Sequence, residues 1–266
     1  MKSNRFQSIT VTVVTTFMLG TLPAYGQLNP AAHAEIEQLQ KSPDSAGFLI
    51  YRGDTFAQRS SSGMPLYRYE RRVSSSPNTI SATHLTSDLA GKLIIVESAT
   101  SSPIYELQHL HVADEQSGYS GSVAVSNNGR HLEFQLDDNG KVSSATEDVF
   151  DDVVSGTSLF GFILNKWDVL KSGSVIPVRM IVMRDKTTYG FDLRFEKQMD
   201  QQVSFSVIPS SFLIRQIVAP LRVVFDATTK NPIRYEGRVP PMEVVSGKLK
   251  SLDARVTYKS LSPKNL

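Results

Sequence analysis

The segment YGFDLRFE (residues 189–196) alternates apolar with charged side chains. Successive side chains of a β-strand point to opposite faces, so one face of this segment is apolar and the other is charged. Such a strand is typical of an antiparallel sheet that has one face against a core and the other in water. The same alternation recurs in three later segments, VSFSV (203–207), IRYEGRV (233–239) and ARVTY (254–258).

Asparagine–glycine pairs separate further strand-like runs in the first half of the chain. Asn128-Gly129 and Asn139-Gly140 each lie between two such runs, and both residue types reach the positive φ that tight hairpin turns need. Two hairpins in succession predict an antiparallel meander over residues 119–145. Other strand-like runs are LYRYERRV (66–73), KLIIVESA (92–99) and IYELQHLHV (104–112).

A short helix is predicted over residues 29–41. Asn29 is a suitable N-cap, and Pro30 falls in the first turn, where a missing N–H costs nothing. Pro43 follows the expected end.

Central helices are predicted over residues of about 145–172. Ser144, followed three residues later by Glu147, fits a capping box. The clearest helical segment is TSLFGFILNKWDVLKSG (157–173), in which apolar side chains recur at spacings of three and four and which contains Trp167, the only tryptophan.

These elements predict a mainly β (α+β) protein. We expect a strongly curved antiparallel sheet, or half-barrel, of about ten strands with short helices on its concave face. The sequence has no repeats of fixed period and no change of composition near its middle. Residues 27–266 are therefore predicted to form a single β-rich domain.

The order FGFILNKWDVLKSGSVIPVRMIVMRDKTTYGFDLRFE (160–196) followed by VSFSVIPSSFLIRQIVAPLRVVFDATTKNPIRYEG (203–237) carries a resemblance. Over roughly residues 145–260 the chain resembles a group of uncharacterised exported bacterial β-proteins. Its layout is similar to that of the half-barrel periplasmic carriers of lipoproteins. That similarity implies a curved antiparallel sheet whose mouth is covered by helices and which holds acyl chains. No motif of the carriers maps onto this sequence, so no functional residue is carried over.

Residues 1–26 have the layout of a secretory signal peptide. Lys2 and Arg5 precede a short apolar run, and small residues at Ala24 and Gly26 predict cleavage between Gly26 and Gln27. The alternative, a membrane anchor, fits less well because the run is short for a span and is diluted by threonine. We expect a protein of the periplasm without a membrane span after cleavage.

Composition excludes several classes of chemistry. Cleavage would remove two of the 28 basic residues and no acidic one, which leaves 26 basic against 26 acidic residues. A neutral chain without a basic block gives no electrostatic basis for binding nucleic acid. The chain has no cysteine, so it has no disulfide, thiol nucleophile or thiolate metal site.

Four sequence patterns suggest specific sites, and each has a simpler structural explanation. A zinc site could use His109 and His111, together with His84 or Asp114. However, the sequence offers no further ligand at a fixed spacing. GYSGS (118–122) lacks the second glycine and the following helix of an esterase elbow. QLDDNGKVSSATE (135–147) lacks calcium ligands at the first and last loop positions. An acid/base cluster would use Glu147, Asp148, Asp151 and Asp152, which also suit a helix terminus and a solvated face. No catalytic residue, metal or cofactor is predicted.

Apolar side chains on the central helix and in SSFLIRQIVAP (210–220) provide the remaining candidate site. We expect an apolar groove, with the helix as its lid, formed by Phe160, Ile163, Trp167, Phe212 and Ile214. The same residues could instead pack as ordinary core.

Two functions follow from these alternatives. The first is a non-enzymatic exported protein that binds or carries an apolar ligand such as a lipid, an acyl chain or a lipoprotein. The alternative is an envelope interaction or assembly factor, with an envelope protein as partner and a core filled by its own side chains. A hydrolase has no supporting motif.

Overall fold

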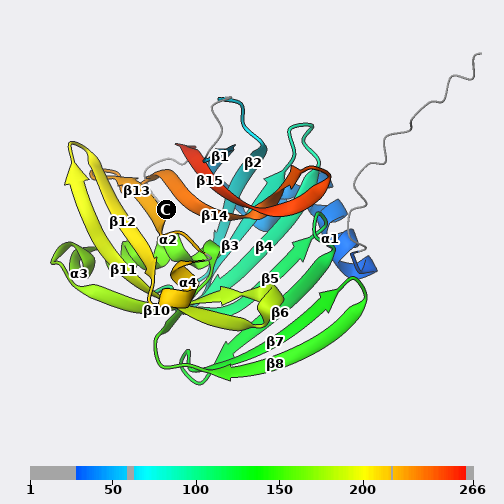
Figure 1. Cartoon of the computed structure of the whole chain (residues 1–266), viewed down its shortest axis with the longest axis horizontal. Coiled ribbons are helices and arrows are strands. Elements are labelled where there is room, and N and C mark those ends of the chain that lie inside the picture. Colours follow the sequence, from blue (N-terminus) through cyan, green and yellow to red (C-terminus); the bar gives the residue numbers. More distant parts are fainter. Residues whose placement is uncertain (1–27, 59–62, 217, 262–266) are drawn as a thin grey trace, which may run out of the picture.

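The computed structural model describes residues 28–58, 63–216 and 218–261. Its fifteen strands form one large open sheet (Figure 1). In chain order the strands are β1 (Phe48–Ala57), β2 (Tyr67–Ser75), β3 (Ile80–Ser87), β4 (Leu93–Ser101), β5 (Leu107–Asp114), β6 (Tyr119–Ser126), β7 (His131–Asp138), β8 (Lys141–Asp148), β9 (Asp152–Val154), β10 (Val175–Val182), β11 (Thr187–Met199), β12 (Gln202–Pro209), β13 (Leu221–Asp226), β14 (Pro232–Val245) and β15 (Lys248–Ser260).

Short helices interrupt the strands. The α-helices are α1 (Pro30–Lys41), α2 (Gly156–Asn165), α3 (Trp167–Lys171) and α4 (Phe212–Arg215), and the 3₁₀ turns are η1 (Pro43–Ala46) and η2 (Met183–Asp185). Within the described ranges, none of the helices has the length and hydrophobicity needed to cross a membrane.

Neighbours in the sheet are mostly neighbours in the chain. The order runs from β8 back to β1, then from β15 back to β9, so β1 pairs with β15 where the two series meet. Every pairing is antiparallel except the short parallel one between β9 and β10. The predicted meander is present in β6, β7 and β8. In its second turn, Asn139 and Gly140 have φ of 53° and 83°, as a tight hairpin requires.

Connectivity forces the sheet to curl. The edge strands β8 and β9 lie at opposite ends of the sheet order, yet only residues 149–151 separate them in the chain. Fifteen strands spaced about 4.8 Å apart make a sheet roughly 65–70 Å wide. A link of this length spans no more than about 14 Å. The two edges must therefore approach each other, and Figure 1 shows the strands curving around the centre of the molecule.

Side chains join the two ends of the curled sheet without closing its hydrogen-bond ladder. The carboxylate of Glu147 on β8 accepts hydrogen bonds from Arg179 Nη2 on β10 at 2.8 Å and from Thr188 N on β11 at 2.7 Å. The Thr188 hydroxyl donates to the same carboxylate at 2.8 Å. Met183 of η2 packs in one apolar cluster with Leu132 and Phe134 of β7.

Helices cover both faces of the sheet. Helix α1 packs Ala32 and Ile36 against Leu85, Val96 and Ala113, which share one face of β3, β4 and β5. Helix α2 lies inside the curve and contacts β3 and β4. The expectation that the helices lie on the concave face is therefore wrong for α1, which packs on the outer face.

Helix α2 has well-defined local determinants. Ser155 caps it by accepting a hydrogen bond from the Ser158 backbone N–H, and the Ser158 hydroxyl accepts one from the Ser155 N–H. The Tyr105 ring lies directly over Gly161, where an added Cβ would stand 2.0 Å from a ring carbon. Glycine at this position lets the loop between β4 and β5 press against the helix.

The main apolar core lies between α2, α3 and strands β10 to β13. Trp167 is 5% exposed and packs edge to face against Phe205 and Phe225, with centroid distances of 5.0 and 5.6 Å. Leu159 and Ile163 complete the apolar face that α2 presents to this core.

The structure corrects two predictions. The sheet has 15 strands rather than about ten. Residues 145–148 belong to β8 and residues 152–154 form β9, so this stretch is not a helix, and Glu147 bonds to Arg179 and Thr188 across the sheet ends instead of capping. The central helical segment begins only at Gly156. The predicted signal peptide, residues 1–26, lies outside the described residues.

Candidate ligand-binding cavity

A cavity of about 560 Å³ lies on the inner side of the sheet. It is bounded by the inner faces of strands from both halves of the sheet, by α2 and by residues near α4. Its volume falls in the range of pockets that bind small organic molecules.

Apolar side chains form most of the cavity wall. Leu159 and Phe160 of α2 line one side, and Met180, Ile181 and Phe191 of β10 and β11 line another. Hydrocarbon groups placed here would leave water and contact carbon on several sides, which is favourable by about 0.8 kcal/mol per CH₂.

One polar row crosses the inner face of four adjacent strands. The register places Tyr51, Arg71, His84 and Glu97 directly opposite one another on β1, β2, β3 and β4. Arg71 Nη1 donates to His84 Nε2 at 2.7 Å and to the Thr157 carbonyl oxygen at 2.6 Å. This row therefore ties the start of α2 to the sheet.

The Arg71 contact determines the state of the histidine. Burial holds the pKa of the His84 imidazole well below its usual range, and the positive charge of Arg71 lowers it further. Arginine can only donate, so His84 Nε2 is the acceptor and the imidazole is neutral. His84 thus adds no charge to the cavity wall.

Two carboxyl groups lie beyond His84 on the inner face. Burial raises the pKa of the Glu97 carboxyl to about 7, and the negative charge of Asp114 adds to this rise. Burial also raises the pKa of Asp114 to about 6, although hydrogen bonds from Ser117 oppose the rise. Both groups lose hydration that a carboxylate would have in water.

Four tyrosine rings also line the cavity, namely those of Tyr69, Tyr119, Tyr235 and Tyr258. Burial raises the pKa of the Tyr69, Tyr119 and Tyr235 phenols, and the negative charge of Glu97 contributes to each rise. The three phenols are therefore neutral at neutral pH.

Four of the five apolar residues predicted as a groove come together in one apolar cluster, in which Phe160, Ile163 and Trp167 are buried and Ile214 packs against them. Phe160 and Ile214 line the cavity. Ile163 is fully buried, and Trp167 packs in the core described above, so neither lines it. Phe212 is 72% exposed on α4.

The motifs set aside in the sequence have structural partners. His111 Nε2 lies 2.7 Å from Glu35 Oε2 of α1, and Ser120 accepts a hydrogen bond from Asn29 Nδ2 at 2.6 Å. His131 Nδ1 lies 2.7 Å from Asp148 Oδ1. Within the described ranges, no group of histidine and carboxylate side chains is arranged to hold a metal ion.

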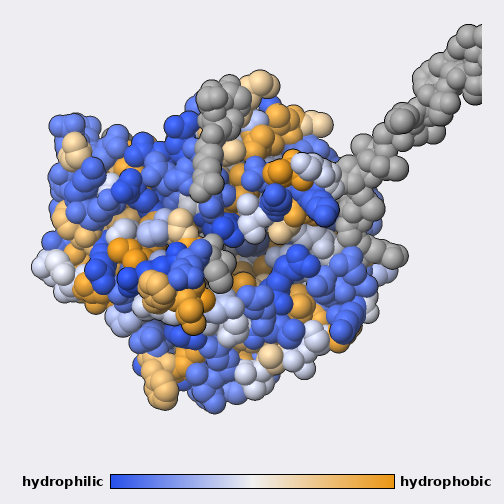
Figure 2. All heavy atoms as spheres, viewed as in Figure 1, coloured by the Kyte–Doolittle hydropathy of each residue, from blue (hydrophilic) through white to orange (hydrophobic). Residues whose placement is uncertain are grey.

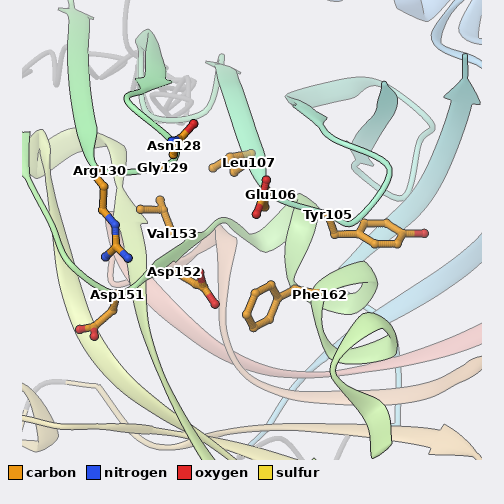
Figure 3. A pocket seen from close by; sticks show the side chains of 10 residues that line it. All are labelled: Tyr105, Glu106, Leu107, Asn128, Gly129, Arg130, Asp151, Asp152, Val153 and Phe162. Atoms are coloured by element: carbon orange, nitrogen blue, oxygen red, sulfur yellow. The ribbon is translucent and has the colours of Figure 1, made fainter. Parts of the chain in front are cut away.

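A second pocket lies between the β4–β5 loop, the β6–β7 turn and α2 (Figure 3). Asp151, Asp152, Arg130 and Phe162 are among the residues around it. Its volume is about 30 Å³, roughly that of one water molecule in the liquid. It is too small for an organic ligand.

Sequence reasoning considered His84 only as a possible additional zinc ligand, and it missed Glu97. His84 and Glu97 stand in the segments ISATHLTS (80–87) and LIIVESATS (93–101), which carry no motif. Each is a polar residue within a strand that is otherwise mostly buried. A polar side chain in such a strand is the one sequence feature that could have indicated a site. Which face each one occupies follows only from the register.

The chain matches no family model and no curated protein at a significant level.

Proposed function

We propose that this is a non-enzymatic exported protein that binds or carries an apolar ligand, such as a lipid or an acyl chain, in the cavity inside its sheet. The observation that supports this most directly is the cavity of about 560 Å³ with Leu159, Phe160 and Met180 in its wall. The resemblance of the sequence layout to that of half-barrel lipoprotein carriers motivates this proposal. The exported location rests on the signal-like residues 1–26.

The energetics of the cavity suit a ligand of moderate affinity. Twelve buried carbon groups at about 0.8 kcal/mol each contribute roughly 9–10 kcal/mol. The cost of ordering a flexible chain and restricting its motion reduces this considerably. After a cost of at least about 4 kcal/mol, a binding free energy of about −5 to −6 kcal/mol remains, so dissociation constants of about 0.1 mM are the expected outcome.

Uptake of single-chain amphiphiles by the full chain tests the proposal. Isothermal titration calorimetry should show one molecule bound per chain. Met180→Trp places a large ring inside the cavity and should weaken binding by at least about tenfold. Val175→Trp changes a 48% exposed residue of the same strand and should bind like the wild type. Absence of binding, or equal binding by Met180→Trp, would contradict a cavity ligand.

A specific surface feature supports the alternative of an envelope interaction factor. Phe212 and Leu213 of α4 are 72% and 69% exposed, and Figure 2 shows apolar residues gathered over α4. Native mass spectrometry after gentle purification separates the two functions. Co-purified lipid supports the carrier, whereas an envelope protein bound through α4, with no lipid present, supports the interaction factor.

A further inference from the structure

The charged residues that line the cavity differ in whether they have partners. Arg238 Nε lies 2.7 Å from Asp253 Oδ1, and Arg184 Nη2 lies 3.3 Å from Asp138 Oδ2. Asp185 accepts a hydrogen bond from the Tyr189 hydroxyl at 2.9 Å.

Glu97 differs from these residues. It is half-buried, and its side chain has neither a hydrogen bond nor an ion pair to any residue that the structure describes. An ionisable group of this kind in an apolar cavity gains from a ligand of opposite charge much more than it would in water.

The surroundings of Glu97 disfavour an anionic head group. The Glu97 and Asp114 carboxyls repel anions, and the neutral His84 offers no charge to offset them. Arg71 does not line the cavity, and its Nη1 already donates to His84 and to the Thr157 carbonyl. A fatty acid carboxylate would therefore face like charge, and the two arginines that do line the cavity, Arg184 and Arg238, already pair with Asp138 and Asp253.

The same surroundings favour a cation. Tyr69, Tyr119 and Tyr235 line the same cavity as Glu97. The Tyr69 ring lies 4.8 Å from the ring of His84, which is the neighbour of Glu97 across the sheet, and Tyr119 lies opposite Asp114. The faces of aromatic rings attract ammonium groups, and an anionic side chain among such rings adds direct charge pairing. A carboxyl group surrounded by tyrosines is chemically suited to a protonated amine.

We propose that the cavity selects amphiphiles with a protonated amine, with Glu97 pairing with the ammonium group and Tyr69, Tyr119 and Tyr235 surrounding it. The apolar tail lies against Leu159 and Phe160. This inference rests on the proposed function, because it identifies the ligand class of the same cavity. Either a simple alkyl amine or the ethanolamine head group of a lipid supplies this chemistry.

Three probes with the same chain length test the selectivity. Dodecylamine, dodecanol and dodecanoic acid are titrated into the full chain at pH 7.5 by calorimetry. The amine should bind at least about tenfold more tightly than the alcohol, and the acid should bind most weakly. Lysophosphatidylethanolamine and lysophosphatidylglycerol with one lauroyl chain then distinguish the source. Preference for the ethanolamine lipid over dodecylamine identifies a lipid head group, and the reverse identifies a simple amine.

Two variants locate the charge that selects the amine. Glu97→Gln keeps the size of the side chain and should reduce the affinity for dodecylamine at least about tenfold, with dodecanol within about threefold of wild type. Glu133→Gln removes an exposed carboxylate of β7 outside the cavity and should leave both affinities unchanged. Circular dichroism and an unfolding curve confirm that both variants fold.

Proton release on binding tests the pairing of Glu97 with the ammonium group independently of the affinities. Glu97 faces Asp114, His84 and the three tyrosines, and its pKa of about 7, set by burial and then by Asp114, leaves it largely protonated at pH 6. Pairing with an ammonium group requires the carboxylate, so binding at pH 6 should release close to one proton. Titrations in buffers of different ionisation enthalpy measure this release, which Glu97→Gln should abolish.

The outcomes separate this inference from the proposed function. If dodecanol binds and the amine has no advantage, or if Glu97→Gln retains the amine preference, amine selectivity is wrong and the apolar cavity stands. If none of the probes binds, both proposals fail.

Discussion

Glu97 illustrates how an isolated carboxyl group couples stability to pH. Its folded pKa of about 7, raised by burial and by Asp114, lies above its ordinary value of 4.5. Between these two values the folded chain binds more protons than the unfolded chain, so the free energy of unfolding falls as pH rises through this window. A ligand-binding carboxyl thus lowers the stability of the unliganded fold at neutral and alkaline pH.

Glu97→Gln should remove this pH dependence. The variant cannot ionise, so its stability relative to wild type should increase by about 1–3 kcal/mol between pH 5 and pH 8. Urea unfolding curves at the two pH values measure the change. Glu133→Gln, at an exposed position, should show no such increase. An equal difference between Glu97→Gln and wild type at both pH values would mean that Glu97 ionises normally.

At the scale of single elements, α2 depends on one close contact. The Tyr105 ring occupies the space where a Cβ at residue 161 would stand, and Tyr105 itself has a positive φ of 62°. The loop is also tied to the helix by Asn165 Nδ2, which donates to the Ile104 carbonyl at 3.0 Å. Loop and helix together form one wall beside the core.

Gly161→Ala should destabilise the protein by about 1–3 kcal/mol through overpacking, although alanine favours helix by about 1 kcal/mol. Gly156→Ala in the same helix meets open space and should be neutral or slightly stabilising. Tyr105→Gly removes the ring and suits the left-handed backbone, so it should relieve the penalty of Gly161→Ala. Thermal unfolding of the single and double variants measures this, and additive losses would contradict the contact.

The alternation of apolar and polar side chains explains which strands were predictable from sequence. β11, β12, β14 and β15 each have one apolar and one polar face, and they were identified from that pattern. β3 is buried at most positions on both faces, so it shows no alternation. β1 was missed because Gly53 interrupts its pattern, and glycine is needed there because a Cβ would stand 2.9 Å from the Tyr258 ring.

In β8, by contrast, the sequence predicted a helix where the structure has a strand. Its burial is low along its whole length, and the sequence KVSSATED (141–148) therefore has no apolar period of two. Serine followed three residues later by glutamate then imitated a helix start.

Among the candidate site residues, Phe160 and Ile214 do line the cavity, whereas Trp167 is core. Helical periodicity identifies an apolar face but does not say whether that face meets side chains or a void.

At the scale of the whole molecule, Glu147 connects the ends of the sheet. Partial burial opposes ionisation of Glu147, but hydrogen bonds from Thr188 and Arg179 outweigh it and lower its pKa below the ordinary value of 4.5. The stabilisation from these bonds is fully present above pH 4.5 and is lost as pH falls through the lowered folded pKa.

Glu147→Gln should lower the free energy of unfolding by about 1–3 kcal/mol at pH 7, because charge-assisted hydrogen bonds are replaced by weaker ones. The difference from wild type should shrink at pH 3. In Glu147→Gln, hydrogen exchange should show faster exchange of the backbone amides in β8, β9 and β10 than in the central strands. Uniform exchange across the sheet, or a variant as stable as wild type at pH 7, would show that the sheet ends do not depend on this carboxylate.

The pairing of β1 with β15 has a consequence for the order of folding. Tyr51 lies opposite Ser260, so contacts at the middle of the sheet join residues from nearly opposite ends of the chain. Bringing such distant segments together carries a high loop-closure entropy and slows folding. The ladder between β1 and β14 is completed only when β15 pairs with both strands. Until then β1 and β14 present unpaired edges, the kind of surface that holdase chaperones protect from aggregation.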